Sequence, residues 1–248
     1  MQLQYVVPAL VGGLALGVAE GTSAQVMSKT LSAPYFRVEV GYAWGTDADL
    51  RDNGLGLICG NPPCNAQGTL NDIGNSYVLG AAIGYRVHPK VRAELALGYR
   101  GGFELDDADA HVPPTSFRGD IRSLSVMLNG YYDFDAAGPW KPFLSAGLGY
   151  ARNKLRTVSA TNPGAGTGNL ANFSLAGDTE DSFAWSVGFG ASYSYGNSVT
   201  LEIAYRYVDL GNIKIPAQTV NFIGFGPQAY GGAKGDLASH EVTIGLRF

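Results

Sequence analysis

The sequence predicts an all-β fold, an eight-stranded antiparallel up-and-down transmembrane β-barrel, on three observations. Large apolar residues occupy every second position in successive segments between residues 35 and 248, and a period of two is that of a β-strand. The positions between them hold glycine, alanine or single charged residues, which suits the crowded lumen of a narrow barrel better than a face in water. Short and long connecting segments alternate, as they do in outer-membrane barrels.

The alternation defines eight strands, near residues 35–45, 76–87, 91–101, 120–134, 141–153, 182–195, 199–210 and 238–248. Short connections rich in Pro, Gly or Asn indicate turns at 88–90, 135–140 and 196–198. Long connections, rich in Gly, Asn, Asp and Pro, are expected to be loops at 46–75, 102–119, 154–181 and 211–237. The long loops are expected outside the cell, and an even strand number is usual for this architecture.

The bulky face of these strands is predicted to contact lipid. Ionisable residues enter it only at the loop-side ends, as with Arg122, Arg152 and His240, so the cost of about 2–4 kcal/mol for a cation at the midplane is avoided. Its aromatic residues are expected in two girdles, a loop-side set of Trp44, Tyr77, Tyr99, Tyr150, Trp185 and Tyr207 and a turn-side set of Phe36, Tyr85, Tyr132, Trp140, Tyr193 and Phe248. A soluble lipocalin-like barrel is the competing fold, but its outer surface would then be largely glycine and alanine.

The small-residue face carries a nearly balanced set of charges. Six arginines and five carboxylates fall on it: Arg37, Arg86, Arg92, Arg100, Arg206 and Arg247 with Glu39, Glu94, Asp133, Glu202 and Glu241. Arg206 and Glu241 lie at similar depth on adjacent strands, so we expect a cross-strand ion pair. The interior of an eight-stranded barrel is just wide enough for side chains to fill, and an unpaired buried charge is costly. An ion-paired plug is therefore favoured over the alternative, a gated or selective narrow pore.

The ends and the composition of the chain suggest an exported protein. Residues 1–24 are predicted to be a signal peptide, with an apolar run from Tyr5 to Ala19 and small residues before Gln25. Met1 to Gln4 carry no Lys or Arg, and the alternative, a membrane anchor, would need about 20 apolar residues. Residues 25–34 form a short N-terminal segment, and 35–248 form the barrel domain. A net charge of −4 without a Lys/Arg run gives no indication of nucleic-acid binding.

The residues with catalytic or metal-binding chemistry have simpler explanations. Cys59 and Cys64 are expected to form a disulfide that closes a loop tip, worth about 2 kcal/mol in chain entropy. His240 and Glu241 point to opposite faces of one strand, and Val242 stands where a lipid A deacylase-like site would need serine. His88 falls in a turn, and His111 with Asp106, Asp107 and Asp109 is interpreted as an acidic loop tip rather than an acid–base or cation site, as are Asp47, Asp49 and Asp52. No catalytic residue, cofactor or metal site is predicted.

Several segments resemble the small outer-membrane β-barrels of the OmpA/opacity-porin type found in Gram-negative bacteria. They are Tyr131–Phe134, Trp140–Tyr150, Phe183–Trp185 with Gly188 and Gly190, Tyr205–Gly211 and His240–Phe248, and they span the strands of nearly the whole barrel. The resemblance implies insertion by the barrel assembly machinery, which reads a terminal aromatic residue such as Phe248. It also implies surface antigen, adhesion or envelope-integrity roles and no common catalytic residues.

The function predicted from these observations is structural and surface-facing, with recognition in the long loops. The expected location is the outer membrane of a Gram-negative bacterium, where a monomer would contact membrane lipids and lipopolysaccharide. Host or other extracellular ligands are expected to bind the loops. Two alternatives are a narrow porin-like channel for small solutes or ions and a carrier that releases hydrophobic solutes through the barrel wall.

Overall fold

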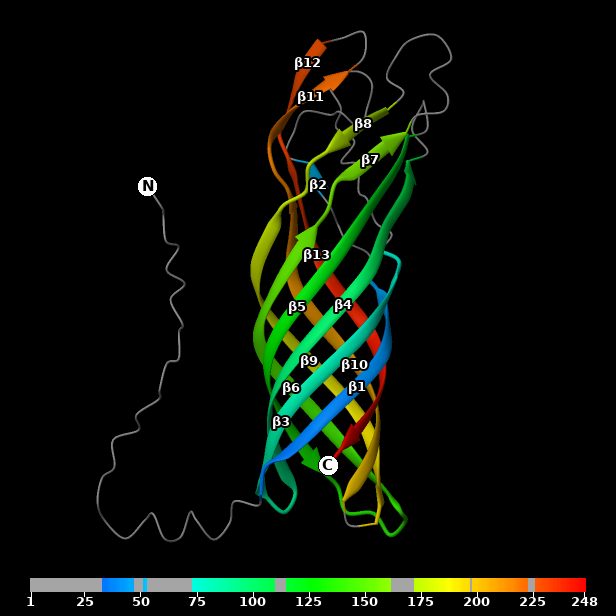
Figure 1. Cartoon of the computed structure of the whole chain (residues 1–248), viewed down its shortest axis with the longest axis vertical. Helices are drawn as coiled ribbons and strands as arrows, with labels where there is room; N and C mark the ends of the chain where they lie inside the picture. The colour runs from blue at the N-terminus through cyan, green and yellow to red at the C-terminus, as the bar shows by residue number, and fades with distance from the viewer. Residues whose placement is uncertain are drawn as a thin grey trace, which may run out of the picture.

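The computed structural model describes residues 33–46, 51–52, 73–109, 115–161, 172–196, 198–222 and 226–248. All regular elements within these ranges are β-strands (Figure 1). The same ranges contain no helix long and apolar enough to cross a membrane. The predicted signal peptide, the proposed disulfide between Cys59 and Cys64, and His111 lie outside them.

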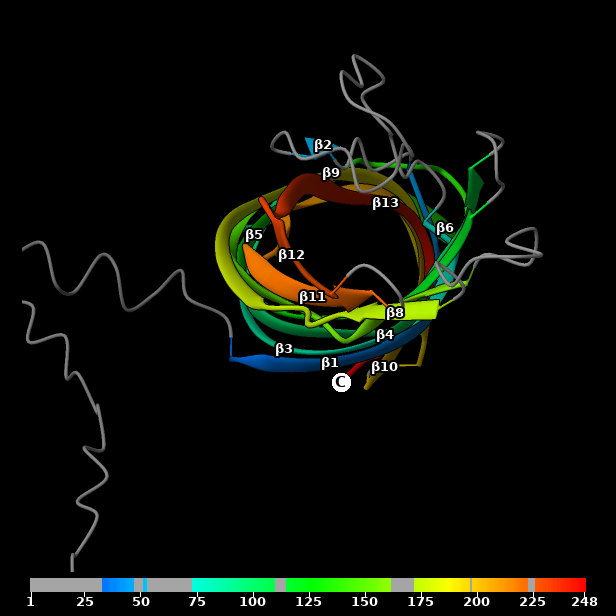
Figure 2. The same cartoon turned by 90° about the horizontal axis from the view of Figure 1, so that it is seen from above.

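Eight long antiparallel strands close the barrel, as the sequence predicted: β1 (Tyr35–Gly45), β3 (Asn75–His88), β4 (Val91–Asp109), β5 (Thr115–Asp133), β6 (Trp140–Leu155), β9 (Thr179–Tyr195), β10 (Val199–Ile215) and β13 (Ala233–Arg247). Each strand pairs with its neighbours in the chain, and β1 pairs with β13 to complete the ring. Figure 2 shows the ring along its axis. An up-and-down barrel is therefore confirmed.

The strands extend further on the loop side than predicted. The expected loops 102–119, 154–181 and 211–237 contain the upper parts of six barrel strands, and five short strands continue the sheet or form hairpins above it. These are β2 (Arg51–Asp52), β7 (Val158–Thr161), β8 (Asn172–Leu175), β11 (Gln218–Phe222) and β12 (Gly226–Tyr230). The prediction ended too early because the outer face above the lipid is polar, so the apolar alternation stops although the strands do not.

Two β-bulges mark this transition. The register shifts between Gly101 and Phe103 on β4 and between Asp209 and Asn212 on β10, and an extra residue reverses which side chains face inward. Gly211 has a φ of 76°, a left-handed conformation that favours glycine, and its N–H donates to Asp209 Oδ1 over 2.8 Å. Above the bulges Phe103, Ile213 and Ile215 therefore point into the barrel and are buried.

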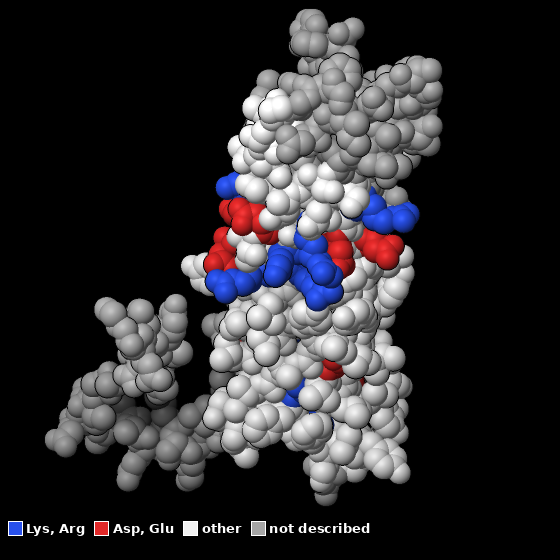
Figure 3. Space-filling model, turned by 45° about the horizontal axis from the view of Figure 1, so that its top comes forward, with Lys and Arg blue, Asp and Glu red and all other residues white. Residues whose placement is uncertain are grey.

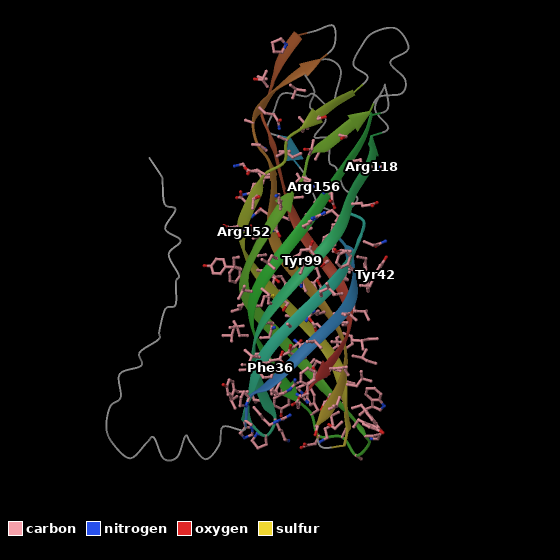
Figure 4. The ribbon with its side chains drawn as sticks, viewed as in Figure 1. Phe36, Tyr42, Tyr99, Arg118, Arg152 and Arg156 are labelled. Carbon is pink, nitrogen blue, oxygen red and sulfur yellow. The ribbon has the colours of Figure 1, made fainter. Side chains whose placement is uncertain are left out.

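Below the bulges the two faces are arranged as predicted. Leu128, Leu148 and Tyr150 point outward and are 63%, 61% and 71% exposed, whereas the arginines and carboxylates of the other face point inward. Figure 4 shows Phe36 near the turn end and Tyr42 and Tyr99 higher on the wall, consistent with two aromatic levels. The lipocalin-like alternative, which would bury the apolar face, is wrong.

Candidate functional site

The lumen contains an ion-paired chain of side chains that begins below the bulges. Glu241 lies between two arginines, with its Oε1 2.5 Å from Arg100 Nε and its Oε2 3.0 Å from Arg206 Nε. The second of these contacts is the predicted cross-strand pair, which is confirmed. Arg206 also donates to Glu39, and Glu39 accepts a further hydrogen bond from Arg37.

Arg37 connects this group to a second one nearer the turns. Its Nε donates to Glu94 Oε2 over 2.9 Å, and its Nη2 donates to the hydroxyl of Tyr131 over 2.9 Å. Arg37 stands on β1, whereas Glu94 and Tyr131 stand on β4 and β5. The contacts therefore cross the lumen between strands that are not neighbours in the sheet.

The second group centres on Arg92, which is completely buried. Its Nη1 lies 3.1 Å from Glu202 Oε1, and its Nη2 lies 2.9 Å from Asp133 Oδ1. Arg86 contacts the other oxygen of Asp133 at 3.0 Å, and Arg247 Nη1 lies 3.4 Å from Glu202 Oε1. All eleven charged residues that the sequence placed in the lumen thus belong to one connected set.

Three aromatic residues support these charges and were missed by the sequence analysis. The guanidinium of Arg92 lies 4.4 Å from the ring centroid of Tyr131 and 5.3 Å from that of Phe143, distances typical of cation–π contacts. The Tyr35 hydroxyl donates to Glu94 Oε1 over 2.8 Å. The signal was available, because all three are bulky residues on the face that otherwise holds small ones.

The space left beside the middle of the network is small, whereas a cavity of about 440 Å³ at the turn end is lined by Arg86, Asp133 and Arg247. A cavity next to Arg100 and Arg206 has a volume of about 20 Å³, and one next to Arg37 and Phe143 has about 10 Å³. Each is about the size needed for one water molecule. Ordered side chains therefore fill the lumen at both places.

The lumen above the charges is apolar. Phe103, Ile121, Leu210 and Leu237 are completely buried there and belong to one cluster with Leu155, Val158 and Leu175. Sequence reasoning missed this layer because it treated most of the segments that form it as loops, with Ile121 and Leu210 at the ends of predicted strands. The barrel is thus filled by two chemically different layers, with ion pairs below and hydrocarbon above.

Hydrogen bonds join the hairpins above the apolar layer. Gln218 on β11 accepts from the backbone N–H of Ala176 over 2.9 Å and donates to its carbonyl over 3.1 Å. Asn153 on β6 donates to the carbonyls of Leu210 and Asn212 on β10. The Gln218 contacts tie the β7–β8 hairpin region to β11, and the Asn153 contacts tie β6 to β10 across the lumen.

The outer wall has no arrangement of catalytic groups among the described residues. His240 faces outward, where its Nδ1 lies 2.7 Å from the Tyr205 hydroxyl and its ring stacks on Trp44. Glu241 is buried in the lumen, which confirms that the two residues occupy opposite faces. The described residues contain no group of three or more His, Cys, Asp or Glu that would hold a metal ion.

Comparison with known proteins agrees with the geometry. Residues 13–248 match the outer membrane protein beta-barrel domain family. The chain is 29% identical to the outer membrane protein PagN of Salmonella typhimurium over 178 residues, which cover 68% of this chain and 71% of PagN. It is 26% identical to a candidate adhesin of Rickettsia bellii over 235 residues, 92% of this chain and 95% of that protein.

Solved structures show the same fold. The outer membrane protein OprG of Pseudomonas aeruginosa superposes with a TM-score of 0.52 at 16% identity, over 87% of this chain and 96% of OprG. Neisserial surface protein A superposes with a TM-score of 0.51 at 18% identity, over 88% of this chain and 97% of that protein. The chain thus belongs to the outer membrane protein beta-barrel domain family and resides in the outer membrane of a Gram-negative bacterium.

Proposed function

We propose that this protein is a surface adhesin in which a filled, non-conducting barrel supports loop-side recognition hairpins. The observation that carries the proposal is the filled lumen, since a barrel that holds eleven paired charges beneath an apolar layer has little room for a solute path. The strands that rise above the bulges support it further, because they hold the hairpins away from the membrane. The similarity to the Rickettsia bellii candidate adhesin favours adhesion over a purely structural role.

Adhesion is tested by exchanging the segments between the described strand ends. We expect replacement of residues 53–72, 162–171 and 223–225 by Gly/Ser linkers of equal length to abolish attachment of bacteria that display the protein to epithelial cells. Replacing the turn residues 135–139 in the same way is the matched control and should leave attachment unchanged. If attachment survives removal of the loop segments at equal surface levels, the recognition site is not on the hairpins.

The filled lumen is tested separately in planar bilayers. We expect no steady single-channel openings from the purified protein at voltages that open larger porins. Steady openings would identify the narrow channel that is the alternative function, whatever the adhesion assay shows. The same preparations, examined for lipase and protease activity, are expected to be inactive.

We also propose that Phe248 is the assembly signal and that the mature barrel is a monomer. The backbone of Phe248 exchanges two hydrogen bonds with Phe36, at 2.8 and 2.9 Å, and its ring is 55% exposed on the outer wall. We expect Phe248→Ala to lower the amount of folded protein in the outer membrane several-fold. Phe36→Ala, which removes the neighbouring ring of similar exposure, is the control and should have a smaller effect.

A further inference from the structure

The outer wall formed by β5 and β6 changes abruptly from apolar to cationic. Leu148 and Tyr150 on β6 are followed on the same face by Arg152 and Lys154, and Arg156 comes directly after the strand; all three cations are exposed. On β5, Leu124 is followed toward the loops by Arg122. Figure 3 shows charged side chains gathered in a band above an almost uncharged surface, and Figure 4 places Arg152 and Arg156 above Tyr99.

Two cations of this band stand in a mutually repulsive position. Arg122 and Lys154 stand directly opposite each other on neighbouring strands, and like charges in that position are destabilising. Asp120 Oδ2 lies 3.5 Å from Arg122 Nη2 and 3.4 Å from Arg156 Nη1. Among the described side chains nearby, Asp181 is held by Arg152 at 2.7 Å, and Glu104 is opposite Asp120. An external anion would relieve the repulsion between Arg122 and Lys154.

An apolar hollow lies on the same wall, closer to the membrane centre. Its floor is a row of small residues in register on three strands, Ala93, Gly130 and Ala146. Leu128, Leu148, Phe183 and Trp185 rise above this row, and the hollow has a volume of about 510 Å³. Its wall is almost entirely hydrocarbon, which suits an acyl chain.

The hollow and the cations are separated by about one leaflet. Ala146 and Arg152 are six residues apart on β6, which is about 20 Å along a strand. A strand tilt of about 40° reduces this to about 15 Å of height, half of a hydrocarbon core about 30 Å thick. A lipid with its phosphate at the cations would therefore have its acyl chains over the hollow.

We propose that this wall is a binding site for one phosphorylated lipid of the outer leaflet, namely the lipid A part of lipopolysaccharide. Arg122, Arg152 and Lys154 bind the phosphate, and the hollow above Ala146 receives an acyl chain. The cations stand on the loop side, which faces the cell exterior, so the lipid comes from the outer leaflet. The site depends on the membrane location of the barrel and not on the proposed adhesion.

The test is native mass spectrometry of the full chain in detergent with bisphosphorylated lipid A. We expect Arg122→Glu with Lys154→Glu to weaken binding about tenfold or more, because charge-assisted contacts to phosphate are lost and repulsion replaces them. The matched control is Lys214→Glu with Lys234→Glu, an exposed pair of like charges in register on β10 and β13, two strands that contribute no residue to the hollow. Circular dichroism verifies the barrel in each variant.

A second variant tests the hollow without touching the charges. Ala146→Phe fills its floor and is expected to weaken lipid A binding several-fold, whereas Leu144→Phe, on the same face outside the hollow, should not. The proposed site would be overturned if both pairs of charge reversals weakened lipid A binding equally, or if dephosphorylated lipid A bound as tightly as the bisphosphorylated form. It would also be overturned if Ala146→Phe had no effect on binding. Equally tight binding of phosphatidylglycerol would overturn the assignment to lipopolysaccharide.

Discussion

The lower and upper halves of the barrel are filled in opposite ways. Below the bulges the wall is apolar outside and charged inside, with Arg92 and Glu241 completely buried. Above them the wall is polar outside, as at Glu104 and Lys214, and apolar inside, as at Phe103 and Leu237. The solvent around the barrel changes from lipid to water between the two halves. The bulges reverse the two faces of β4 and β10 between the halves, so that the same strands present apolar side chains to lipid below and polar side chains to water above.

The largest expected effect is the loss of a charge from the lower half. Glu241→Ala leaves Arg100 and Arg206 without their shared carboxylate, and breaking a buried ion pair costs about 3–5 kcal/mol. We expect the free energy of unfolding, measured by denaturant titration in lipid vesicles, to fall by that amount. Asp135→Asn removes an exposed turn carboxylate and is the control. A fall in stability no greater than that of the control would mean that the lower network is not a stabilising unit.

A truncation in the upper half is expected to cost slightly less. Leu237→Ala removes a completely buried side chain and should lower the free energy of unfolding by about 2–5 kcal/mol. The variant should also accelerate hydrogen exchange in β10 and β13 above the bulges and leave the lower strands protected. Uniform loss of protection along the barrel would show that the two halves unfold as one unit.

The bulge itself is tested by Gly211→Ala. A Cβ at Gly211 would lie 2.3 Å from the Ser182 Cβ, and the left-handed backbone alone costs about 1–2 kcal/mol for a non-glycine residue. Gly196→Ala provides the matched control, since Gly196 also has a positive φ, of 64°, but nothing lies within 4 Å of its added Cβ. We expect the Gly211 variant to lose more stability than the control in the same titration. Equal losses would assign the whole effect to the backbone.

The smallest effect is expected at the hairpins. Gln218→Ala removes both hydrogen bonds to Ala176, each worth about 0.5–1.5 kcal/mol, and the site is solvent-exposed, so the change should be near the lower end. Limited proteolysis of intact cells should cut this variant faster near residue 176, with global stability almost unchanged. Thr219→Ala, which changes an exposed neighbour, should leave the cleavage rate as it is.

The sequence predicted the lower half well and the upper half poorly, for one physical reason. Lipid imposes an apolar outer face, so parity alone placed Arg37 and Glu241 inside and Leu148 outside. Counting every second residue fails at Gly101 and Asp209, because a bulge there exchanges the inward and outward faces of the strand. The bulge leaves no apolar pattern in the sequence that would reveal it.

The sequence predicted which charged residues form the candidate site, but not which arginine pairs with which carboxylate. Only Arg206 and Glu241 were matched in advance, since they lie directly opposite each other on neighbouring strands. Contacts such as Arg37 with Glu94 cross the lumen and depend on closure, diameter and strand stagger, which no local pattern encodes.

The lumen network has a consequence for how the barrel enters the membrane. Glu241 is on the last strand and Arg100 is on the third barrel strand, so their pair forms only after the sheet curls and its two edges meet. A partly inserted sheet would present unneutralised arginines to hydrocarbon, which is strongly unfavourable. We therefore expect insertion and closure to be a single cooperative event, with half-built intermediates too short-lived to accumulate.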